Sequence, residues 1–335
     1  MTIKVAINGF GRIGRMVLRA LMESGRKDIH VVAINDLGSI SDNAHMFKFD
    51  SVHGRFRGNV ITSPDSLDVG SGPMKVFAEP NPEKLPWGSL GIDIVMECSG
   101  HFTDRQSAAK HLTAGAKRVL ISAPATGADI TVVYGVNHTN IKREHVVISN
   151  GSCTTNCLAP VADVLNMGVG IEAGYMTTIH SYTGDQRLVD TLHKDLHRAR
   201  AAAMSMIPTS TGAAKALGLV LPDLQGKLDG CAIRVPSPNV SLIDFTFTAK
   251  RPTTPDEINK LMIEAAKGKL KGVLDVESQP LVSVDFNHHP ASSIFDTTQT
   301  QVVNGNFCRV LSWYDNEWGF ANRMSDVAVV IGKTI

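Results

Sequence analysis

The chain has 335 residues, a length typical of two domains. It carries 33 Lys and Arg against 32 Asp and Glu, and this near-neutral balance excludes a general electrostatic attraction for nucleic acid or an anionic membrane. The hydrophobic fraction of 43% is typical of a globular enzyme, and no apolar run approaches the roughly 18 residues that a transmembrane helix needs.

The start of the chain and its cysteines both indicate a cytoplasmic protein. A strand-like run begins within the first few residues, without the charged segment and apolar stretch that form a secretory signal. The cysteines are few and odd in number, namely Cys98, Cys153, Cys157, Cys231 and Cys308. Such a set argues against a disulfide framework and for a reducing compartment.

The first half of the chain alternates between strand-like and helix-like segments. A helix is predicted over 14–23, where apolar residues recur at helical spacing. Strands are predicted over 3–7, 30–34, 92–96, 118–121, 131–134 and 145–148. Strands separated by helical segments indicate an α/β fold with a Rossmann-type, doubly wound parallel sheet.

Beyond about Asn150 the pattern changes to long alternating runs, which indicate an α+β domain built on a mostly antiparallel sheet. These runs predict strands over 175–180, 231–235, 241–249, 280–285, 293–296 and 307–313. The polar, basic segment 183–205 has no regular period, and irregular segments of this length tend to be functional. A last helix is predicted over 317–331. The predicted domains are 1–151, with a C-terminal helix at about 316–335, and 152–315.

A glycine motif, NGFGRIG at 8–14, follows the first predicted strand and opens the first predicted helix, as a dinucleotide fingerprint requires. Gly9 allows the tight turn, Gly11 lets the backbone approach a pyrophosphate, and Gly14 lets helix and strand pack closely. The helix N-terminus offers N–H groups to phosphate. Asp36, 22 residues after Gly14, is suited to bind ribose hydroxyls and to repel the 2′-phosphate of NADP. The first domain is therefore predicted to bind NAD, with a ligand-free glycine turn as the alternative.

A second motif, GSCTTNC at 151–157, lies between a strand-like run and apolar residues at helical spacing. Cys153 is therefore expected at a strand-to-helix turn, where N–H groups and the helix dipole lower the pKa of a thiol. Pro160 is expected to kink the helix. Cys157 lies one turn further on and is interpreted as a core residue. No set of ligands at suitable spacing indicates a metal site.

Three long motifs carry a resemblance to a known family: AINGFGRIGR near the start, SNGSCTTNCLAP in the middle and SWYDNEWGF near the end. Shorter matches are HGRF (53–56), STGAAKA (210–216) and RVPSPNVSLID (234–244). On these residues the chain resembles phosphorylating glyceraldehyde-3-phosphate dehydrogenase over essentially its whole length. The cysteine motif is the most specific of the matches.

The resemblance implies that Cys153 attacks an aldehyde to give a hemithioacetal and that His180 acts as general base. Hydride transfer to NAD then leaves a thioester, and inorganic phosphate attacks it to release an acyl phosphate. The implied reaction is the glycolytic oxidation of glyceraldehyde 3-phosphate to 1,3-bisphosphoglycerate. The domain at 152–315 is thus expected to be catalytic. The implied assembly is a homotetramer.

The resemblance also implies ligands for substrate and cofactor. Residues similar to the family's phosphate contacts are Ser152, Thr154, Thr183, Arg198, Thr211, Gly212 and Arg234. Residues similar to its further cofactor contacts are Arg12, Ile13, Ser122 and Asn316, the last being like the contact of the nicotinamide amide. Hydroxyl and guanidinium groups are chemically suited to phosphate. In the basic segment, Arg200 is the alternative to Arg198.

Two departures from the family pattern concern the cofactor. Pro80 stands where many relatives have an arginine that contacts the adenosine half, and Thr191-Leu192 replaces a Leu-Pro pair found in many NAD-specific relatives. The use of NADP therefore stays open. Two other functions also stay open: a related enzyme such as erythrose-4-phosphate dehydrogenase, and a non-catalytic NAD-binding sensor. His193 and His197 lack a third ligand and predict no metal site.

Overall fold

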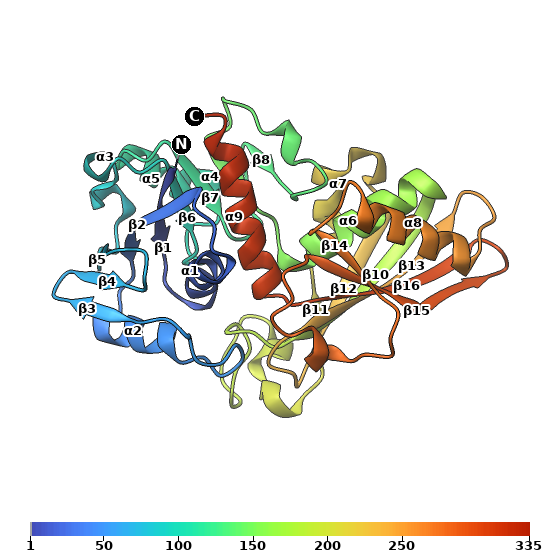
Figure 1. The fold of residues 1–335 in the computed structure, drawn as a ribbon. Coiled ribbons are helices and arrows are strands. Elements are labelled where there is room, and N and C mark those ends of the chain that lie inside the picture. The colour runs from blue at the N-terminus through green and yellow to red at the C-terminus, as the bar shows by residue number, and fades with distance from the viewer. Residues whose placement is uncertain (1) are drawn as a thin grey trace. The chain divides into compact units, whose positions relative to one another are not determined.

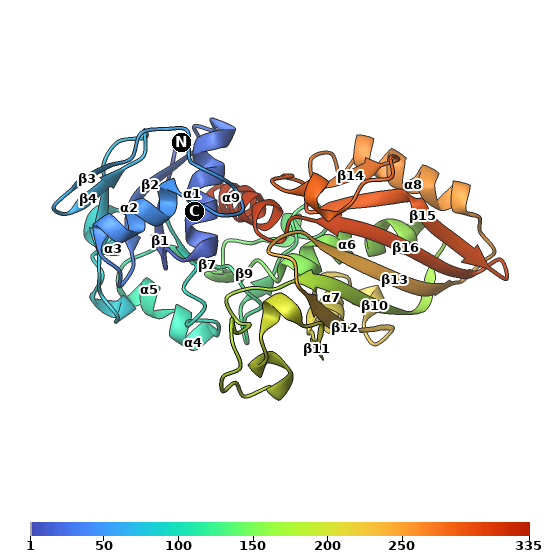
Figure 2. The same cartoon turned by 90° about the horizontal axis from the view of Figure 1, so that it is seen from below.

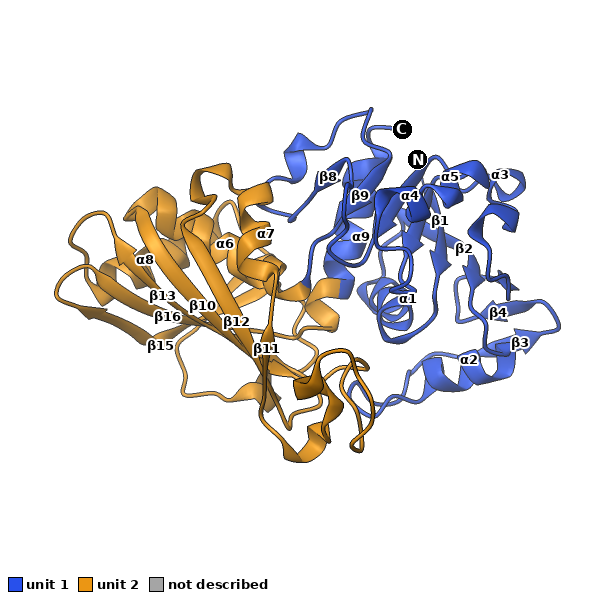
Figure 3. Cartoon of the chain, turned by 180° about the vertical axis from the view of Figure 1, so that it is seen from behind, with its two compact units in different colours: residues 1–152, 321–335 blue, residues 153–320 orange. Residues whose placement is uncertain are grey.

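The computed structural model describes residues 2–335 of the chain. The chain divides into two compact units: unit 1 comprises Met1–Ser152 with Ala321–Ile335, and unit 2 comprises Cys153–Phe320 (Figure 3). Each unit contains one large sheet. Over residues 2–335, no helix has both the length and the apolar character needed to cross a membrane.

The sheet of unit 1 has nine strands and is parallel at its centre. In chain order the strands are β1 (Ile3–Asn8), β2 (Ile29–Asn35), β3 (Ile61–Ser63), β4 (Ser66–Asp68), β5 (Met74–Phe77), β6 (Ile94–Glu97), β7 (Arg118–Ile121), β8 (Ile130–Thr131) and β9 (Val147–Ser149). Their order in the sheet is β3-β4-β5-β2-β1-β6-β7-β9-β8. The pairings from β5 to β8 are all parallel. The order β5-β2-β1-β6-β7-β9 is that of two mononucleotide-binding halves meeting at β1 and β6, which confirms the predicted doubly wound sheet.

Helices cover both faces of this sheet, since successive side chains of a strand point to opposite faces. The helices are α1 (Arg12–Ser24), α2 (Ile40–Lys48), α3 (Trp87–Leu90), α4 (Arg105–Ala108) and α5 (Lys110–Thr113), with 3-10 turns η1 (Pro82–Lys84) and η2 (His138–Asn140). Ile7 lies against Gly14 of α1, whereas its neighbour Ala6 packs with Trp87 of α3. Figure 2 shows α1 on one face of the sheet and α4 and α5 on the other.

The last helix, α9 (Trp318–Gly332), belongs to unit 1 from Ala321 onward (red in Figure 1). Its residues Met324, Val327 and Ile331 recur at helical spacing and are fully buried. Gly332 lies against Ile3 of β1, where a larger residue would overlap the isoleucine side chain. The C-terminal segment is therefore part of the core of unit 1.

The sheet of unit 2 has seven strands and is mostly antiparallel, as predicted. The strands are β10 (Ile171–Ser181), β11 (Ile207–Ser210), β12 (Leu228–Val235), β13 (Ser241–Ala249), β14 (Leu274–Glu277), β15 (Ser293–Val303) and β16 (Phe307–Tyr314). Their order is β11-β12-β10-β13-β16-β15-β14. Only the pairs β10–β12 and β14–β15 are parallel.

Three helices form a layer on one face of this sheet, as Figures 1 and 2 show. They are α6 (Cys153–Gly168), α7 (Ala213–Val220) and α8 (Pro255–Lys267), and the 3-10 turns are η3 (Leu196–Ala199), η4 (Ala202–Met204), η5 (Pro222–Leu224) and η6 (Ser283–Phe286). On β10 the alternate residues Met176, Thr178 and His180 are buried. Helix α6 continues through Pro160 to Gly168.

The predicted strand over 280–285 is wrong. This segment is a loop that leads into η6, and the backbone N–H of Val282 donates to the side chain of Asp285. A local turn thus takes the place of pairing with a neighbouring strand. Val282 and Val284, whose alternation suggested a half-buried strand, are both exposed.

The predicted strand over 131–134 is wrong beyond Thr131, which ends β8. The N–H of Val133 donates to the side chain of Asn137, and this turn replaces the ladder. The sequence patterns also fail to indicate the helices α2 to α5, α7 and α8 and the strands β3 to β5, β11 and β14. Most of these elements are short or lie at the edge of the sheet, where periodicity is weak.

Candidate active site

The glycine loop after β1 has the geometry of a dinucleotide-binding turn. Gly9 has a φ of +87°, and a Cβ there would overlap the backbone of Ser99. A Cβ on Gly14 would overlap the carbonyl oxygen of Gly9. At Gly11, the N-cap of α1, no atom lies within 4 Å of the Cβ position. Packing therefore requires two of the glycines, and the third faces the open space that a pyrophosphate needs.

A cavity of about 390 Å³ opens at the carboxyl ends of β1, β2 and β6. It is lined by Asn8, Gly9, Gly11, Asn35, Asp36, Leu37, Glu79, Pro80, Cys98, Ser99, His101 and Phe102. The Asp36 carboxylate is held there because it accepts hydrogen bonds from the N–H groups of Phe10 (2.8 Å) and Gly38 (2.9 Å). Doubly wound sheets bind their ligands in the crevice at the carboxyl ends of the strands, which is where this cavity lies. With the glycine loop and the Asp36 carboxylate in its lining, the cavity fits a dinucleotide.

The other predicted cofactor residues in unit 1 are Arg12, Ile13 and Ser122. Arg12 and Ile13 form the first turn of α1, and the guanidinium of Arg12 pairs with Asp50. Ser122 directly follows β7, and its N–H donates to the carbonyl oxygen of Glu97.

Beneath the cavity lies a buried polar network that the sequence patterns do not indicate. The Glu97 carboxylate, at the end of β6, accepts from Asn8 Nδ2 (2.6 Å), His111 Nε2 (2.9 Å) and both the N–H and the hydroxyl of Ser99. Trp87 Nε1 donates to His111 Nδ1 (3.0 Å), so Nε2 is the ring nitrogen that donates to Glu97. Glu97 thereby holds the loops after β1 and β6. Its position at a strand end facing the crevice is the only sequence signal for this role.

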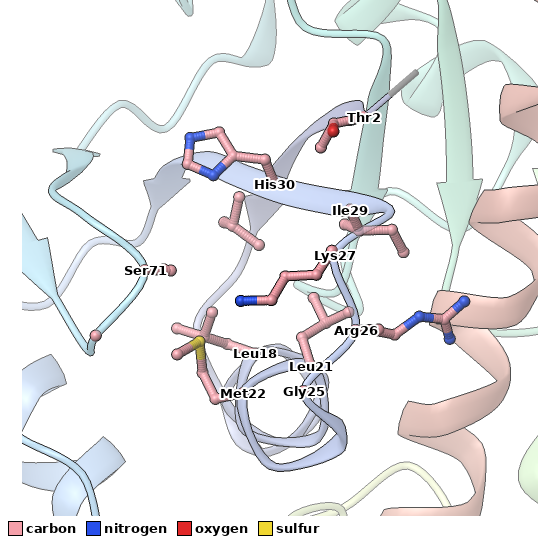
Figure 4. Close-up of a pocket in the computed structure, with 12 residues that line it drawn as sticks. Thr2, Leu18, Leu21, Met22, Gly25, Arg26, Lys27, Ile29, His30 and Ser71 are labelled. Carbon is pink, nitrogen blue, oxygen red and sulfur yellow. The ribbon is translucent and has the colours of Figure 1, made fainter.

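A second cavity in unit 1, of about 440 Å³, lies at the end of α1 and the start of β2 (Figure 4). Its lining includes Leu18, Leu21 and Met22 of α1, with Lys27 and His30 nearby. These residues are at the amino end of β2, whereas ligands of doubly wound sheets bind at the carboxyl ends. None of the predicted site residues lines this cavity.

Cys153 and His180 meet in unit 2. Cys153 is the first residue of α6, and His180 lies next to the last residue of β10. The sulfur of Cys153 is 3.5 Å from His180 Nε2. His180 Nδ1 is 2.7 Å from the carbonyl oxygen of Ser181 and 2.9 Å from Arg234 Nη1. In the tautomer that donates from Nδ1 to the Ser181 carbonyl oxygen, the lone pair of Nε2 faces the thiol. This is the geometry of a nucleophile beside a base.

The electrostatics of this pair differ from the prediction. Burial raises the pKa of the Cys153 thiol, whereas the charge of Arg234 and the hydrogen bonds from Thr154 act in the opposite direction. Burial, and then the charge of Arg234, lowers the pKa of His180 to about 3. The thiol pKa is therefore raised, not lowered as the helix terminus alone suggests. The imidazole is neutral and able to accept a proton.

Tyr314 connects the helix layer to the sheet behind the cysteine. Its hydroxyl lies 2.9 Å from the hydroxyl of Thr154 and 2.8 Å from that of Thr178, and all three residues are buried. Its ring packs edge-on against His180. The hydroxyl of Thr154, a predicted phosphate ligand, is thus hydrogen-bonded to Tyr314. Tyr314 is in the motif SWYDNEWGF, but its contacts depend on the register of β16.

Arg234 lies beside His180 because β10 and β12 run parallel with these two residues in register. Its Nη1 donates to the carbonyl oxygen of Ser181 (3.0 Å) and lies 2.9 Å from His180 Nδ1. Burial lowers the pKa of Arg234, and the nearby charge of Arg198 adds to the effect. Two guanidinium groups in proximity favour an anion.

The other predicted phosphate residues make contacts within their own segments. Thr183 follows β10, and its N–H donates to Gln186. Arg198, in η3, donates to Thr209 and pairs with Asp185. The remaining members stand at helix starts, with Ser152 directly before α6 and Thr211 and Gly212 directly before α7. Arg200, the alternative to Arg198, pairs with Asp190.

Asn316, the predicted nicotinamide contact, follows β16 and is buried. Its Oδ1 accepts hydrogen bonds from the hydroxyls of Ser181 and Ser241, each at 2.9 Å. The sequence patterns do not indicate either serine. Both bonds use Oδ1, so Nδ2 is the end of the amide that is left to donate.

The remaining cysteines make no disulfide, and all five are free thiols. Cys157 is fully buried against Ser293 and Ser312, and burial raises the pKa of its thiol to about 12. This agrees with its interpretation as a core residue. Over residues 2–335, no three His, Cys, Asp or Glu side chains cluster in a way that could hold a metal ion.

A dinucleotide-type crevice in one unit and a cysteine–histidine–arginine cluster in the other define a class of protein, a dehydrogenase with a cysteine-centred site. Comparison with known proteins specifies the family. Residues 3–105 match the NAD binding domain of glyceraldehyde 3-phosphate dehydrogenase, and residues 152–316 match its C-terminal domain.

Curated relatives with the name glyceraldehyde-3-phosphate dehydrogenase match the whole chain. One from Xanthobacter flavus is 68% identical over 333 residues, which are 99% of each chain. One from Cereibacter sphaeroides is 62% identical over 335 residues, the full length of both. One from Geobacillus stearothermophilus is 53% identical over 334 residues, 99% of each chain. The chain therefore belongs to the glyceraldehyde-3-phosphate dehydrogenase family, which confirms the resemblance found from its motifs.

Proposed function

We propose that the chain catalyses the NAD-dependent oxidative phosphorylation of glyceraldehyde 3-phosphate to 1,3-bisphosphoglycerate, a glycolytic step. The observation that carries the proposal is the pairing of Cys153 with His180, 3.5 Å apart, with the histidine oriented by the carbonyl oxygen of Ser181. Family membership and the dinucleotide-type crevice support NAD as the cofactor.

The reaction begins at the sulfur of Cys153. As the sulfur attacks the aldehyde carbon, His180 Nε2 takes the thiol proton and passes it to the former carbonyl oxygen, which gives a hemithioacetal. Bound NAD would supply the hydride acceptor; as hydride is lost, His180 Nε2 takes the hydroxyl proton, and a thioester remains on Cys153. Phosphate oxygen then attacks the thioester carbon, the carbon–sulfur bond breaks, and acyl phosphate leaves. The released thiolate takes the proton from His180, which regenerates the thiol.

His180 and Arg234 have complementary tasks in these steps. A neutral imidazole can take the proton in one step and return it in a later one. The positive charge of Arg234 stabilises anionic sulfur and is available to substrate phosphate. Ser152, Thr183, Thr211 and Gly212 are the proposed partners for the two phosphates, together with Thr154 and Arg198.

Steady-state assays separate this function from the alternatives. Glyceraldehyde 3-phosphate and erythrose 4-phosphate are supplied in turn, each with and without inorganic phosphate. We expect the triose phosphate to give the higher kcat/KM, with NADH formation dependent on phosphate. A phosphate-independent rate or a preference for the tetrose would overturn the assignment. A chain without NADH formation on either aldehyde would be a non-catalytic NAD-binding protein.

We also propose that the chain forms a homotetramer. Residues 183–206 expose large apolar side chains, each between 70% and 88% accessible, namely Leu188, Val189, Leu192, Leu196, Met204 and Met206. Such a concentration of apolar surface on one loop is typical of a protein interface. Analytical ultracentrifugation at micromolar concentration should give four times the chain mass, and Leu192→Glu should shift the distribution to smaller species. A monomer in the parent protein would contradict the proposal.

The free state of all five cysteines supports activity in a reducing, cytoplasmic environment.

A further inference from the structure

The amide of Asn316 is held by two buried serines from neighbouring strands. Ser181 ends β10, and Ser241 begins β13, which pairs with β10. Both hydroxyls lie 2.9 Å from Asn316 Oδ1. Ser181 and Ser241 are almost completely buried, so solvent does not compete for these hydroxyls.

The direction of the hydrogen bonds follows from the remaining contacts. The N–H of Ser181 donates to Ser241 Oγ (3.1 Å), which occupies a lone pair of that oxygen. The hydroxyl of Ser241 then donates its proton to Asn316 Oδ1. With the amide reversed, both hydroxyls would have to accept from Nδ2. The hydroxyl of Ser241 could then donate to Ser181 Oγ, 3.5 Å away, but the buried hydroxyl proton of Ser181 would lose its acceptor. A buried donor without a partner costs about 1–3 kcal/mol, so the oxygen of Asn316 faces the serines.

The segment around Asn316 is itself anchored. The Asp315 carboxylate accepts from Asn239 Nδ2 (2.8 Å) and the N–H of His288 (2.7 Å) through Oδ2, and from the N–H groups of Glu317 and Trp318 through Oδ1. The backbone at Asn316 is therefore fixed, and only the amide orientation is left for the two serines to decide.

Ser181 also contacts His180, through its backbone. Its carbonyl oxygen accepts from His180 Nδ1 (2.7 Å) and from Arg234 Nη1 (3.0 Å), while its hydroxyl donates to Asn316. One residue thus orients the base through its backbone and the amide through its side chain. The two tasks are separable, because replacing the serine by alanine removes only the hydroxyl.

We propose that Ser181 and Ser241 are positioning residues that lock the Asn316 amide with Nδ2 outward, so that it donates to the carboxamide oxygen of nicotinamide. They thereby make the site selective for a strong carbonyl acceptor at that position. This inference rests on the proposed use of NAD by the enzyme.

The test compares binding of NAD with binding of thionicotinamide adenine dinucleotide, whose sulfur is a weaker hydrogen-bond acceptor. Dissociation constants are measured calorimetrically without aldehyde, so no turnover is involved. We expect the parent enzyme to bind NAD more tightly. In Ser181→Ala, Ser241→Ala and the double variant, NAD binding should weaken by roughly fivefold, the value of one neutral hydrogen bond, while binding of the thio analogue changes little. The ratio of the two constants therefore falls toward one.

Three further variants and readouts make the result specific. Ser312→Ala removes another buried serine hydroxyl from the same sheet, one that contacts Ser293 and not Asn316, and should keep the parent ratio. Asn316→Asp replaces the donor by an acceptor and should abolish the preference for NAD, even if a serine variant does not fold. The rate of Cys153 alkylation by iodoacetamide without NAD should be unchanged in Ser181→Ala, because the carbonyl that holds His180 remains.

The outcomes separate the two levels of the proposal. A parent enzyme that does not bind NAD would overturn the proposed function itself. A parent enzyme that prefers NAD, together with folded serine variants or Asn316→Asp that keep the same ratio, would overturn the positioning role. A loss of alkylation in Ser181→Ala would mean that the hydroxyl supports the histidine instead of the amide.

Discussion

Replacement of Tyr314 by phenylalanine tests the link between the helix layer and the sheet behind Cys153. The change removes one oxygen atom and, with it, the hydrogen bonds to Thr154 (2.9 Å) and Thr178 (2.8 Å). All three side chains are buried, so water does not take the place of the lost hydroxyl. The ring and its packing against His180 are retained.

The magnitude follows from these contacts. A neutral hydrogen bond contributes about 1 kcal/mol, and a buried hydroxyl left without a partner costs about 1–3 kcal/mol. Thr154 still has the Cys153 sulfur as an alternative partner, although the Tyr314 hydroxyl no longer orients it, so most of the cost falls on Thr178. We expect Tyr314→Phe to lower the free energy of unfolding by about 2–4 kcal/mol, which is roughly 4–16 °C in the melting temperature.

The same change should slow the alkylation of Cys153. The hydroxyl of Thr154 loses the partner that orients it toward the sulfur, so the rate with iodoacetamide should fall roughly two- to tenfold. Differential scanning calorimetry and alkylation kinetics measure the two effects. Tyr175→Phe, on β10 but about half exposed, is the control and should stay within about 0.5 kcal/mol of the parent. A Tyr314→Phe protein with unchanged melting and alkylation would refute this reasoning.

Four other changes test the remaining parts of the site. Cys153→Ser should retain NAD binding in a fluorescence titration but lose the burst of thioester formation; a normal burst would exclude Cys153 as nucleophile. Asp36→Ala should raise the ratio of kcat/KM with NADP to that with NAD, since a carboxylate repels the 2′-phosphate, and an unchanged ratio would count against its role. Glu97→Gln removes the acceptor shared by the buried network and should weaken NAD binding roughly tenfold in calorimetry while alkylation of Cys153 proceeds normally. Arg234→Leu removes a charge that lowers the pKa of His180, so this pKa should rise. Because the base must be neutral, the acidic limb of the pH–rate profile should move to higher pH. An imidazole pKa that stayed near 3 in an NMR titration would contradict this prediction.

Local features of the fold and site could be predicted from the sequence because they depend on residues close together in the chain. The turn at Gly9 requires a positive φ, and Gly14 lies so close to the carbonyl oxygen of Gly9 that a Cβ does not fit, so the motif by itself indicates the loop. The position of Cys153 at the start of a helix follows from the apolar spacing after it. The same reliance on local patterns produced the wrong strand at 280–285, where a capped turn competes with pairing.

Contacts between distant parts of the chain could not be read in this way. His180 and Arg234 are 54 residues apart and become neighbours only through the parallel register of β10 and β12. Glu97 and His111 likewise join only in the folded sheet of unit 1, and burial there decides which polar groups must be satisfied. The thiol pKa is a further case, because a helix terminus predicts a lower value and burial raises it.

The glycine loop, the cysteine at a helix start and membership of the glyceraldehyde-3-phosphate dehydrogenase family were thus determined by the sequence alone, through backbone requirements and motifs of a few consecutive residues. The tertiary structure decided how the groups are used: which nitrogen of His180 faces the sulfur, which end of the Asn316 amide is left to donate, and which hydroxyls are engaged behind Cys153. These properties arise from strand register and burial, which set the distance between groups and remove water as a competing partner.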